Sequence, residues 1–145
     1  MVIDWKFAAA MMSRIGIAAV LGGLIGWERE KANQSAGLRT HILICLGAAL
    51  VMCTGEYLFV IYSDRSNLDP ARLGAQVVSG IGVLCAGTIM KEGSTIKGLT
   101  TATGLWCAAC VGLAAGSGNI APAAGATLII LIVLRLFRYL ENKAL

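Results

Sequence analysis

Long apolar segments alternate with short polar ones along the chain, and five of them are long enough to predict helices. A helix that crosses a bilayer needs about 20 mainly apolar residues. The pattern therefore predicts membrane-spanning helices over residues 7–27, 38–62, 73–90, 99–116 and 120–136. The third and fourth are short and rich in glycine, so we expect other helices rather than lipid to cover them. The fifth contains the segment TLIILIVLRLF and no glycine after Gly125, which indicates a face turned to lipid or to a partner.

The composition favours a membrane protein over a soluble one. Hydrophobic residues make up 57% of the 145 residues and charged residues only 14%, whereas soluble domains carry about 25% charge. The first apolar segment lacks the basic start and the cleavage pattern of a secretory signal peptide, so we expect it to remain as a helix. We expect one all-α transmembrane domain over residues 1–145, with no soluble C-terminal domain.

The basic residues between the helices predict how the chain is oriented. Eight of them fall on the side of the C-terminus and three on the other side. Because basic loops stay in the cytoplasm, we predict a multi-pass protein with its N-terminus outside and its C-terminus in the cytoplasm. The larger set is Arg29, Lys31, Arg39, Lys91, Lys97, Arg135, Arg138 and Lys143, and the smaller set is Lys6, Arg65 and Arg72.

A short phrase, Gly-Leu-x-Thr, occurs at residues 37–40 and again at 98–101, each time opening an apolar helix after a segment that contains glutamate. This layout predicts two parallel helical hairpins, related by an axis along the membrane normal, followed by a C-terminal helix. A chance match of so short a phrase is the alternative. If the repeat is real, the two polar loops meet around one site on the cytoplasmic side.

The polar residues near these loops form the predicted cytoplasmic-side site. Arg39 stands in the first turn of its helix, where the helix dipole disfavours a cation, so we predict an ion pair with Glu28. A contact with lipid phosphate is the alternative for Arg39. The single histidine, His41, is expected to donate or accept a hydrogen bond, and Gln76 to bond to another helix or to line a polar cavity. The complete predicted set is Glu28, Arg39, Thr40, His41, Gln76, Glu92, Lys97, Thr100 and Thr101.

Other candidate chemistry is weaker. Arg14 lies inside the first predicted helix, where we prefer its extension to the outer headgroups over an ion pair with Glu56. Glu28, Glu30 and Glu92 are the only carboxylates that could meet around Mg²⁺ on the cytoplasmic side, and the neighbouring basic residues disfavour such a site. We therefore predict no metal and no cofactor. The chain has no nucleotide-binding glycine motif and no nucleophile–base set, so we predict neither an enzyme nor a nucleic-acid partner.

Small residues at helical spacing predict close contacts between helices, because lipid tails provide no hydrophobic drive for helix association. We favour packing within the chain, and leave a homodimer open. The predicted packing residues are Gly22, Gly26, Gly80, Gly82, Gly87, Gly104, Ala108, Gly112 and Gly116.

Three stretches, GGLIGWERE, AGLRTHILICLGAAL and the segment from Asp69 to Gly116, together resemble the MgtC/SapB family of bacterial inner-membrane proteins. The resemblance implies magnesium homeostasis at low Mg²⁺ and, in pathogens, virulence through survival inside host phagocytes. It favours a regulatory protein that binds membrane lipid and another membrane complex such as the F-type ATP synthase, with transport of Mg²⁺ or another ion as the alternative. Residues that match the family pattern are Glu28, Arg39, Thr40, Gln76, Gly80, Gly82, Gly87, Gly98, Leu99, Thr101 and Trp106.

Overall fold

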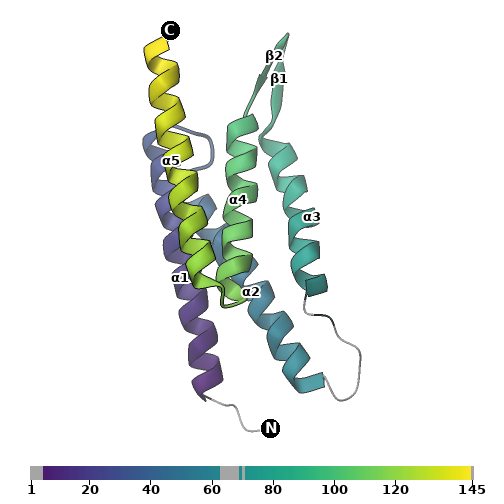
Figure 1. The fold of residues 1–145 in the computed structure, drawn as a ribbon. Coiled ribbons are helices and arrows are strands. Elements are labelled where there is room, and N and C mark those ends of the chain that lie inside the picture. Colours follow the sequence, from purple (N-terminus) through teal and green to yellow (C-terminus); the bar gives the residue numbers. More distant parts are fainter. Residues whose placement is uncertain (1–4, 63–68, 70, 145) are drawn as a thin grey trace.

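Five helices make up nearly all of the computed structural model, which describes residues 5–62, 69 and 71–144 (Figure 1). They are α1 (Trp5–Lys31), α2 (Leu38–Tyr62), α3 (Ala71–Thr88), α4 (Leu99–Gly116) and α5 (Ile120–Ala144). The predicted all-α fold is confirmed. The fifth helix continues past residue 136, because its more polar end is still composed of good helix formers such as arginine and leucine. Between α3 and α4 lies an antiparallel hairpin that the sequence did not predict, formed by β1 (Met90–Glu92) and β2 (Thr95–Lys97).

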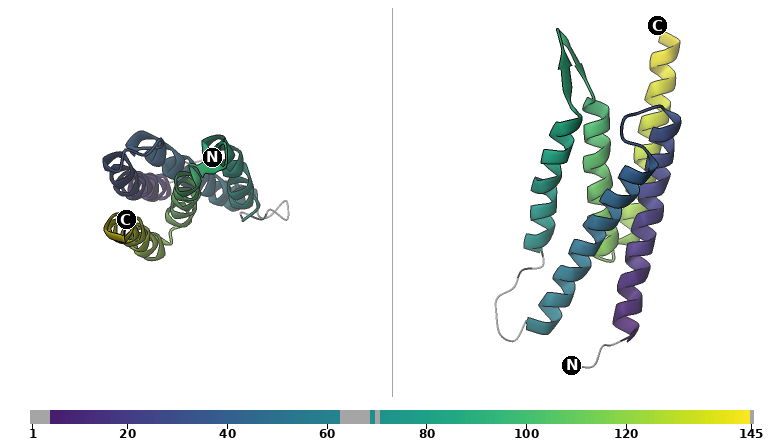
Figure 2. Two further views of the ribbon diagram at one scale, coloured as in Figure 1. Left: turned by 90° about the horizontal axis from the view of Figure 1, so that it is seen from above. Right: turned by 180° about the vertical axis from the view of Figure 1, so that it is seen from behind.

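The chain is a multi-pass membrane protein. Among the described residues, α1, α2, α4 and α5 are long and apolar enough to cross a membrane. The helix α3 is not in that group, since glycines, Gln76 and Ser79 lower its apolar content. It nevertheless packs against α2 and α4, beside the part of the bundle nearest the β1–β2 hairpin, while α1 and α2 extend further toward the other end (Figures 1 and 2).

The helices contact one another in a pattern that agrees with a repeat. The pairs α1–α2 and α3–α4 pack together, and α2 also packs against α4. The first helix of each hairpin also packs against the second helix of the other hairpin, α1 against α4 and α3 against α2. These two contacts are equivalent if the hairpins are related by a two-fold repeat. The predicted parallel repeat requires this pattern of contacts, and the repeat itself stays a prediction. The last helix, α5, packs against α1 and α4.

The core of the bundle is made of small side chains. It contains Ala18, Cys45, Ala49, Ala108 and Ala115, all with no exposed surface. Such residues allow the helix backbones to approach closely. At Gly22 of α1, for example, an added Cβ would lie 2.6 Å from the Cβ of Cys45 and 2.7 Å from the carbonyl oxygen of His41 in α2.

The predicted packing glycines divide into two groups. Tight contacts with α2 surround Gly22, Gly26, Gly112 and Gly116, and a looser one surrounds Gly104. The other three were expected to pack against helices of this chain, and that expectation is wrong: an added Cβ at Gly80, Gly82 or Gly87 would meet no atom within 4 Å. The physical reason is the place of α3 at the edge of the bundle, where it contacts α2 and α4 through one narrow side.

Candidate functional site

One end of the bundle gathers most of the polar segments. The loop between α1 and α2, the β1–β2 hairpin and the C-terminal end of α5 all lie there, while the N-terminal end of α1 lies at the other (Figures 1 and 2). We call this the hairpin end. The first loop also touches the start of α4, because the hydroxyl of Thr101 donates to Oε1 of Gln34 across 3.2 Å. Thr101 is buried, so this hydrogen bond joins the two Gly-Leu-x-Thr regions inside the protein.

Glu28 forms a buried ion pair, but its partner is not the predicted one. Nε of Arg29 donates to Oε2 of Glu28 at 2.5 Å, and both side chains are about 95% buried. Arg39 is exposed on α2, so the predicted Glu28–Arg39 pair is wrong. The reason is helix rotation: Arg39 lies about 200° around the helix from His41, two residues later, which faces the core. Arg29 was overlooked because adjacent helical residues seldom face each other.

Two other described carboxylates near this end, Glu30 and Glu92, also have partners of their own. Oε2 of Glu30 accepts the backbone N–H of Leu38 at 2.8 Å and so caps the start of α2. Glu92 pairs with Lys97 at 2.5 Å on the exposed hairpin. Within the part of the chain that the structure describes, no group of three His, Cys, Asp or Glu side chains is placed to hold a metal ion.

His41 is completely buried between α1, α2 and α4. Its Nδ1 lies 2.9 Å from the carbonyl oxygen of Gly37, one turn earlier, and can donate to it. Its Nε2 has no hydrogen-bond partner among the described residues. That nitrogen faces Gly104, where an added Cβ would lie 3.7 Å away. An added Cβ there would therefore make an ordinary van der Waals contact with the imidazole.

The structure thus brings together only part of the predicted site. Glu28, His41 and Thr101 are buried at the hairpin end. The remaining predicted residues are exposed, and of these Thr100 lines a cavity beside the Glu28–Arg29 pair. Thr40 and Thr100 lie on the first turns of α2 and α4, and Gln76 lies on α3 nearer the opposite end. The full exposed set is Arg39, Thr40, Gln76, Glu92, Lys97 and Thr100.

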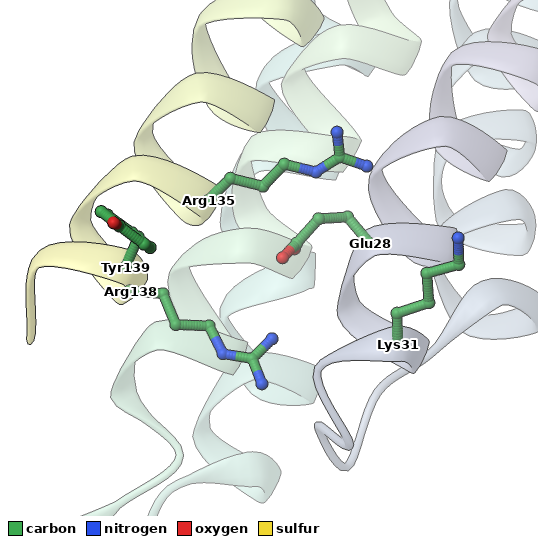
Figure 3. A pocket seen from close by; sticks show the side chains of 5 residues that line it. All are labelled: Glu28, Lys31, Arg135, Arg138 and Tyr139. Atoms are coloured by element: carbon green, nitrogen blue, oxygen red, sulfur yellow. The ribbon is translucent and has the colours of Figure 1, made fainter. Parts of the chain in front are cut away.

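Two neighbouring cavities beside the Glu28–Arg29 pair were not predicted. The smaller, about 270 Å³, is lined by Glu28, Lys31, Arg135, Arg138 and Tyr139 (Figure 3). The larger, about 510 Å³, is lined by Arg29, Gln34, Thr100, Val133, Leu134, Phe137 and Arg138. Because Arg138 lines both, we treat them as one feature, the α1–α5 cleft. The sequence does not reveal this cleft, because the basic residues at the end of α5 indicate only the orientation of the chain in the membrane.

At the opposite end of the bundle, Arg14 forms an internal ion pair. Its Nη1 lies 2.5 Å from Oε2 of Glu56 and 3.4 Å from the carbonyl oxygen of Gly116. The preferred expectation, in which Arg14 extends to the headgroups, is therefore wrong, and the alternative pairing with Glu56 is found. The pairing links α1, α2 and the end of α4, since Gly118 also lies against the guanidinium.

The family model and the similar proteins described below all indicate one family. The model of the MgtC family matches residues 15–143. Protein MgtC of Brucella abortus is 46% identical over 136 residues, which cover 92% of this chain and 54% of that protein. The Putative magnesium transporter YhiD of Escherichia coli K12 is 41% identical over 137 residues, covering 93% and 64%. Protein MgtC of Salmonella typhimurium is 46% identical over 115 residues, covering 79% and 46%.

The chain spans only about half to two thirds of the length of these relatives. No solved structure matches it.

Proposed function

This chain belongs to the MgtC family, and we propose that it is a bacterial inner-membrane protein that supports adaptation to low Mg²⁺ by binding another membrane complex. The family resemblance suggests the F-type ATP synthase as that complex and, in pathogens, a contribution to survival inside host cells. The observation that carries the proposal is the uncovered face of α3.

The helix α3 is poorly suited to face lipid alone. It packs against α2 and α4 at the edge of the bundle (Figure 1), yet only Gly74, Ile81 and Cys85 of its 18 residues are buried. Small residues are enriched where membrane helices touch. A second membrane protein that supplies a helix would cover the exposed face and bond to Gln76. That face comprises Ala75, Gln76, Ser79, Gly80, Gly82, Val83, Ala86 and Gly87.

The internal polar groups support a binding role over a conducting one. Arg14 pairs with Glu56 at one end and Arg29 with Glu28 at the other. Each charge is thus neutralised locally, and between the two pairs the core consists mainly of alanine, cysteine and aliphatic side chains, with His41 and Thr127 as buried polar members. An ion that crossed this core would have to replace its water shell with apolar groups, which is unfavourable.

The test combines growth with crosslinking in a bacterium that lacks its own copy of the gene. Gly80→Leu/Gly87→Leu enlarges the α3 face, and Gly125→Leu is the matched control, because Gly125 on α5 also has open space around it. We expect the α3 variant to insert and stay folded but to lose growth at low Mg²⁺. A photo-crosslinker at position 83 should also stop reaching the membrane subunits of the ATP synthase. Normal growth with an unchanged crosslinking pattern would contradict the proposal.

A second candidate is a small Mg²⁺ transporter, which the name of the Escherichia coli relative favours. Purified protein in liposomes that contain a Mg²⁺-sensitive dye separates the two functions. Uptake above that of empty liposomes, abolished in Glu56→Gln, would favour transport. Dye signals equal to those of empty liposomes would favour the binding role.

We also propose that the hairpin end faces the cytoplasm, because the eight basic residues of the larger set lie at this end. Cysteine labelling of Ser94→Cys, in the turn of the hairpin, should occur only when the reagent enters the cell. Labelling from the periplasmic side would reverse the orientation. The complementary expectation, an outside location for residues 63–71, falls mostly on residues 63–68, which lie outside the described residues.

A further inference from the structure

The α1–α5 cleft contains more positive than negative charge. Its lining includes the cations Arg29, Lys31, Arg135 and Arg138, and a single described carboxylate, Glu28. Figure 3 shows Arg135 and Arg138 extending from α5 on either side of Glu28, which points back toward α5. Neither arginine comes within 4.0 Å of a carboxylate oxygen among the described residues. The described lining of the cleft therefore carries an excess of positive charge.

The side chain of Arg29 offers unused hydrogen-bond donors to the larger cavity. The residue is only 3% exposed, and the one hydrogen bond of its side chain within the described part of the chain uses Nε, toward Glu28. Its two Nη atoms are left without a hydrogen bond while the side chain lines the larger cavity. These Nη atoms are not among the fully buried polar atoms that lack a partner, so they are accessible from the cavity, where they could donate to a bound acceptor.

Two aromatic residues place the cleft at the level of the lipid headgroups. Trp27 on α1 is 56% exposed and Tyr139 on α5 is 63% exposed. Exposed tryptophan and tyrosine are enriched where a membrane protein passes from hydrocarbon into headgroups. The ammonium of Lys31 lies 5.0 Å from the centre of the Trp27 ring, so one of the cations of the cleft lies at this depth.

One wall of the larger cavity is apolar. Val133, Leu134 and Phe137 of α5 line it on the side that continues into the hydrophobic part of the helix, and Arg138 follows directly. A cation cluster joined to an apolar wall matches a ligand that carries a phosphate and an acyl chain. Inorganic phosphate would use the cations alone.

We propose that the α1–α5 cleft binds the headgroup phosphate of an anionic phospholipid, with one acyl chain along Val133, Leu134 and Phe137. The guanidinium groups of Arg29, Arg135 and Arg138 would donate to the phosphate oxygens, since arginine presents paired N–H groups that match them. Basic pockets between membrane helices recognise anionic headgroups in this way. Under the proposed orientation, the lipid comes from the cytoplasmic leaflet.

The experiment uses the full chain in detergent, with retained lipid measured by native mass spectrometry. The probes are phosphatidylglycerol, phosphatidylcholine and inorganic phosphate. Arg135→Gln/Arg138→Gln removes two exposed cations of the cleft, and Arg39→Gln/Lys91→Gln is the control with two exposed cations at the same end. Arg29 is left intact because its removal would strand the buried Glu28. We expect phosphatidylglycerol affinity to fall about tenfold or more in the first variant and to stay unchanged in the control.

Several results would overturn the proposal. Equal retention of phosphatidylcholine and phosphatidylglycerol would show that the charge of the headgroup is not recognised. An equal loss in the control variant would indicate a diffuse electrostatic effect. The variant Phe137→Ser distinguishes a lipid headgroup from free phosphate as the ligand. Weaker lipid binding in this variant would support the contact between an acyl chain and the apolar wall. Unchanged lipid binding, with inorganic phosphate displacing the lipid, would assign the cleft to a free anion.

Discussion

Gly112 lies where α4 crosses α2, and a single added methyl group there should destabilise the whole bundle. The Cβ of an alanine at this position would overlap the carbonyl oxygen of Cys45 and lie 2.9 Å from the Cβ of Ala48. Both neighbours belong to α2 and one is backbone, so neither can rotate away. The variant Gly112→Ala therefore has to push α2 outward, together with the contacts that α2 makes with α1.

The control is Gly125→Ala on α5. Both glycines lie inside helices, but an added Cβ at Gly125 would meet no atom within 4 Å. Replacing a helical glycine by alanine stabilises a helix by about 1 kcal/mol, and overpacking a tight contact costs about 1–3 kcal/mol. We expect the free energies of unfolding of the two variants to differ by about 1–3 kcal/mol, with Gly112→Ala the less stable, because the helix gain is common to both.

The measurement is unfolding of the purified variants in one detergent, followed by far-ultraviolet circular dichroism as temperature or denaturant increases. Both variants must first show the same helix content as the parent protein. If Gly112→Ala were as stable as Gly125→Ala, the close approach of α4 to α2 would be refuted. The small-residue explanation of the core would then fail with it.

Three further predictions concern the charged side chains. In a double-mutant cycle, Arg14→Gln and Glu56→Gln should couple by about 1 kcal/mol, because both side chains are partly exposed, at 25% and 35%; additive losses of stability would contradict the pair. Removing either Glu28 or Arg29 alone should cost about 3 kcal/mol or more, since the remaining charge stays buried, and the double variant should be no worse than the worse single one. Glu28→Gln combined with Arg39→Gln should instead be additive, and measurable coupling would restore the pairing expected from the helix dipole.

The helices themselves were predictable because hydrophobic length is a local property. A segment such as residues 38–62 is apolar over its whole length and flanked by polar residues, so its ends follow from the sequence alone. The helix start at residue 99 follows in the same way, after Gly98, which adopts a left-handed backbone with φ of 87°. The β1–β2 hairpin escaped prediction because its three-residue strands are too short to produce an alternating pattern.

The candidate site was predictable only in part. His41 and Thr101 were chosen for polarity within apolar segments, and both are buried. The partner of Glu28 was not predictable, because proximity along the chain says nothing about the direction in which Arg39 projects from α2. The α1–α5 cleft joins Arg29 to Arg138, which lie at opposite ends of the sequence. No local pattern could have brought them together.

By itself, the sequence determined that this protein is a bundle of apolar helices with most of its basic residues at one end, since both properties depend on composition within single segments. The tertiary structure decided which glycines pack: Gly22 and Gly112 lie tightly against α2, whereas an added Cβ at Gly82 on α3 would meet no atom within 4 Å. It also decided which charges meet. The physical reason is that the rotation of a helix about its axis depends on all of its neighbours at once, and that rotation sets which side chains point inward.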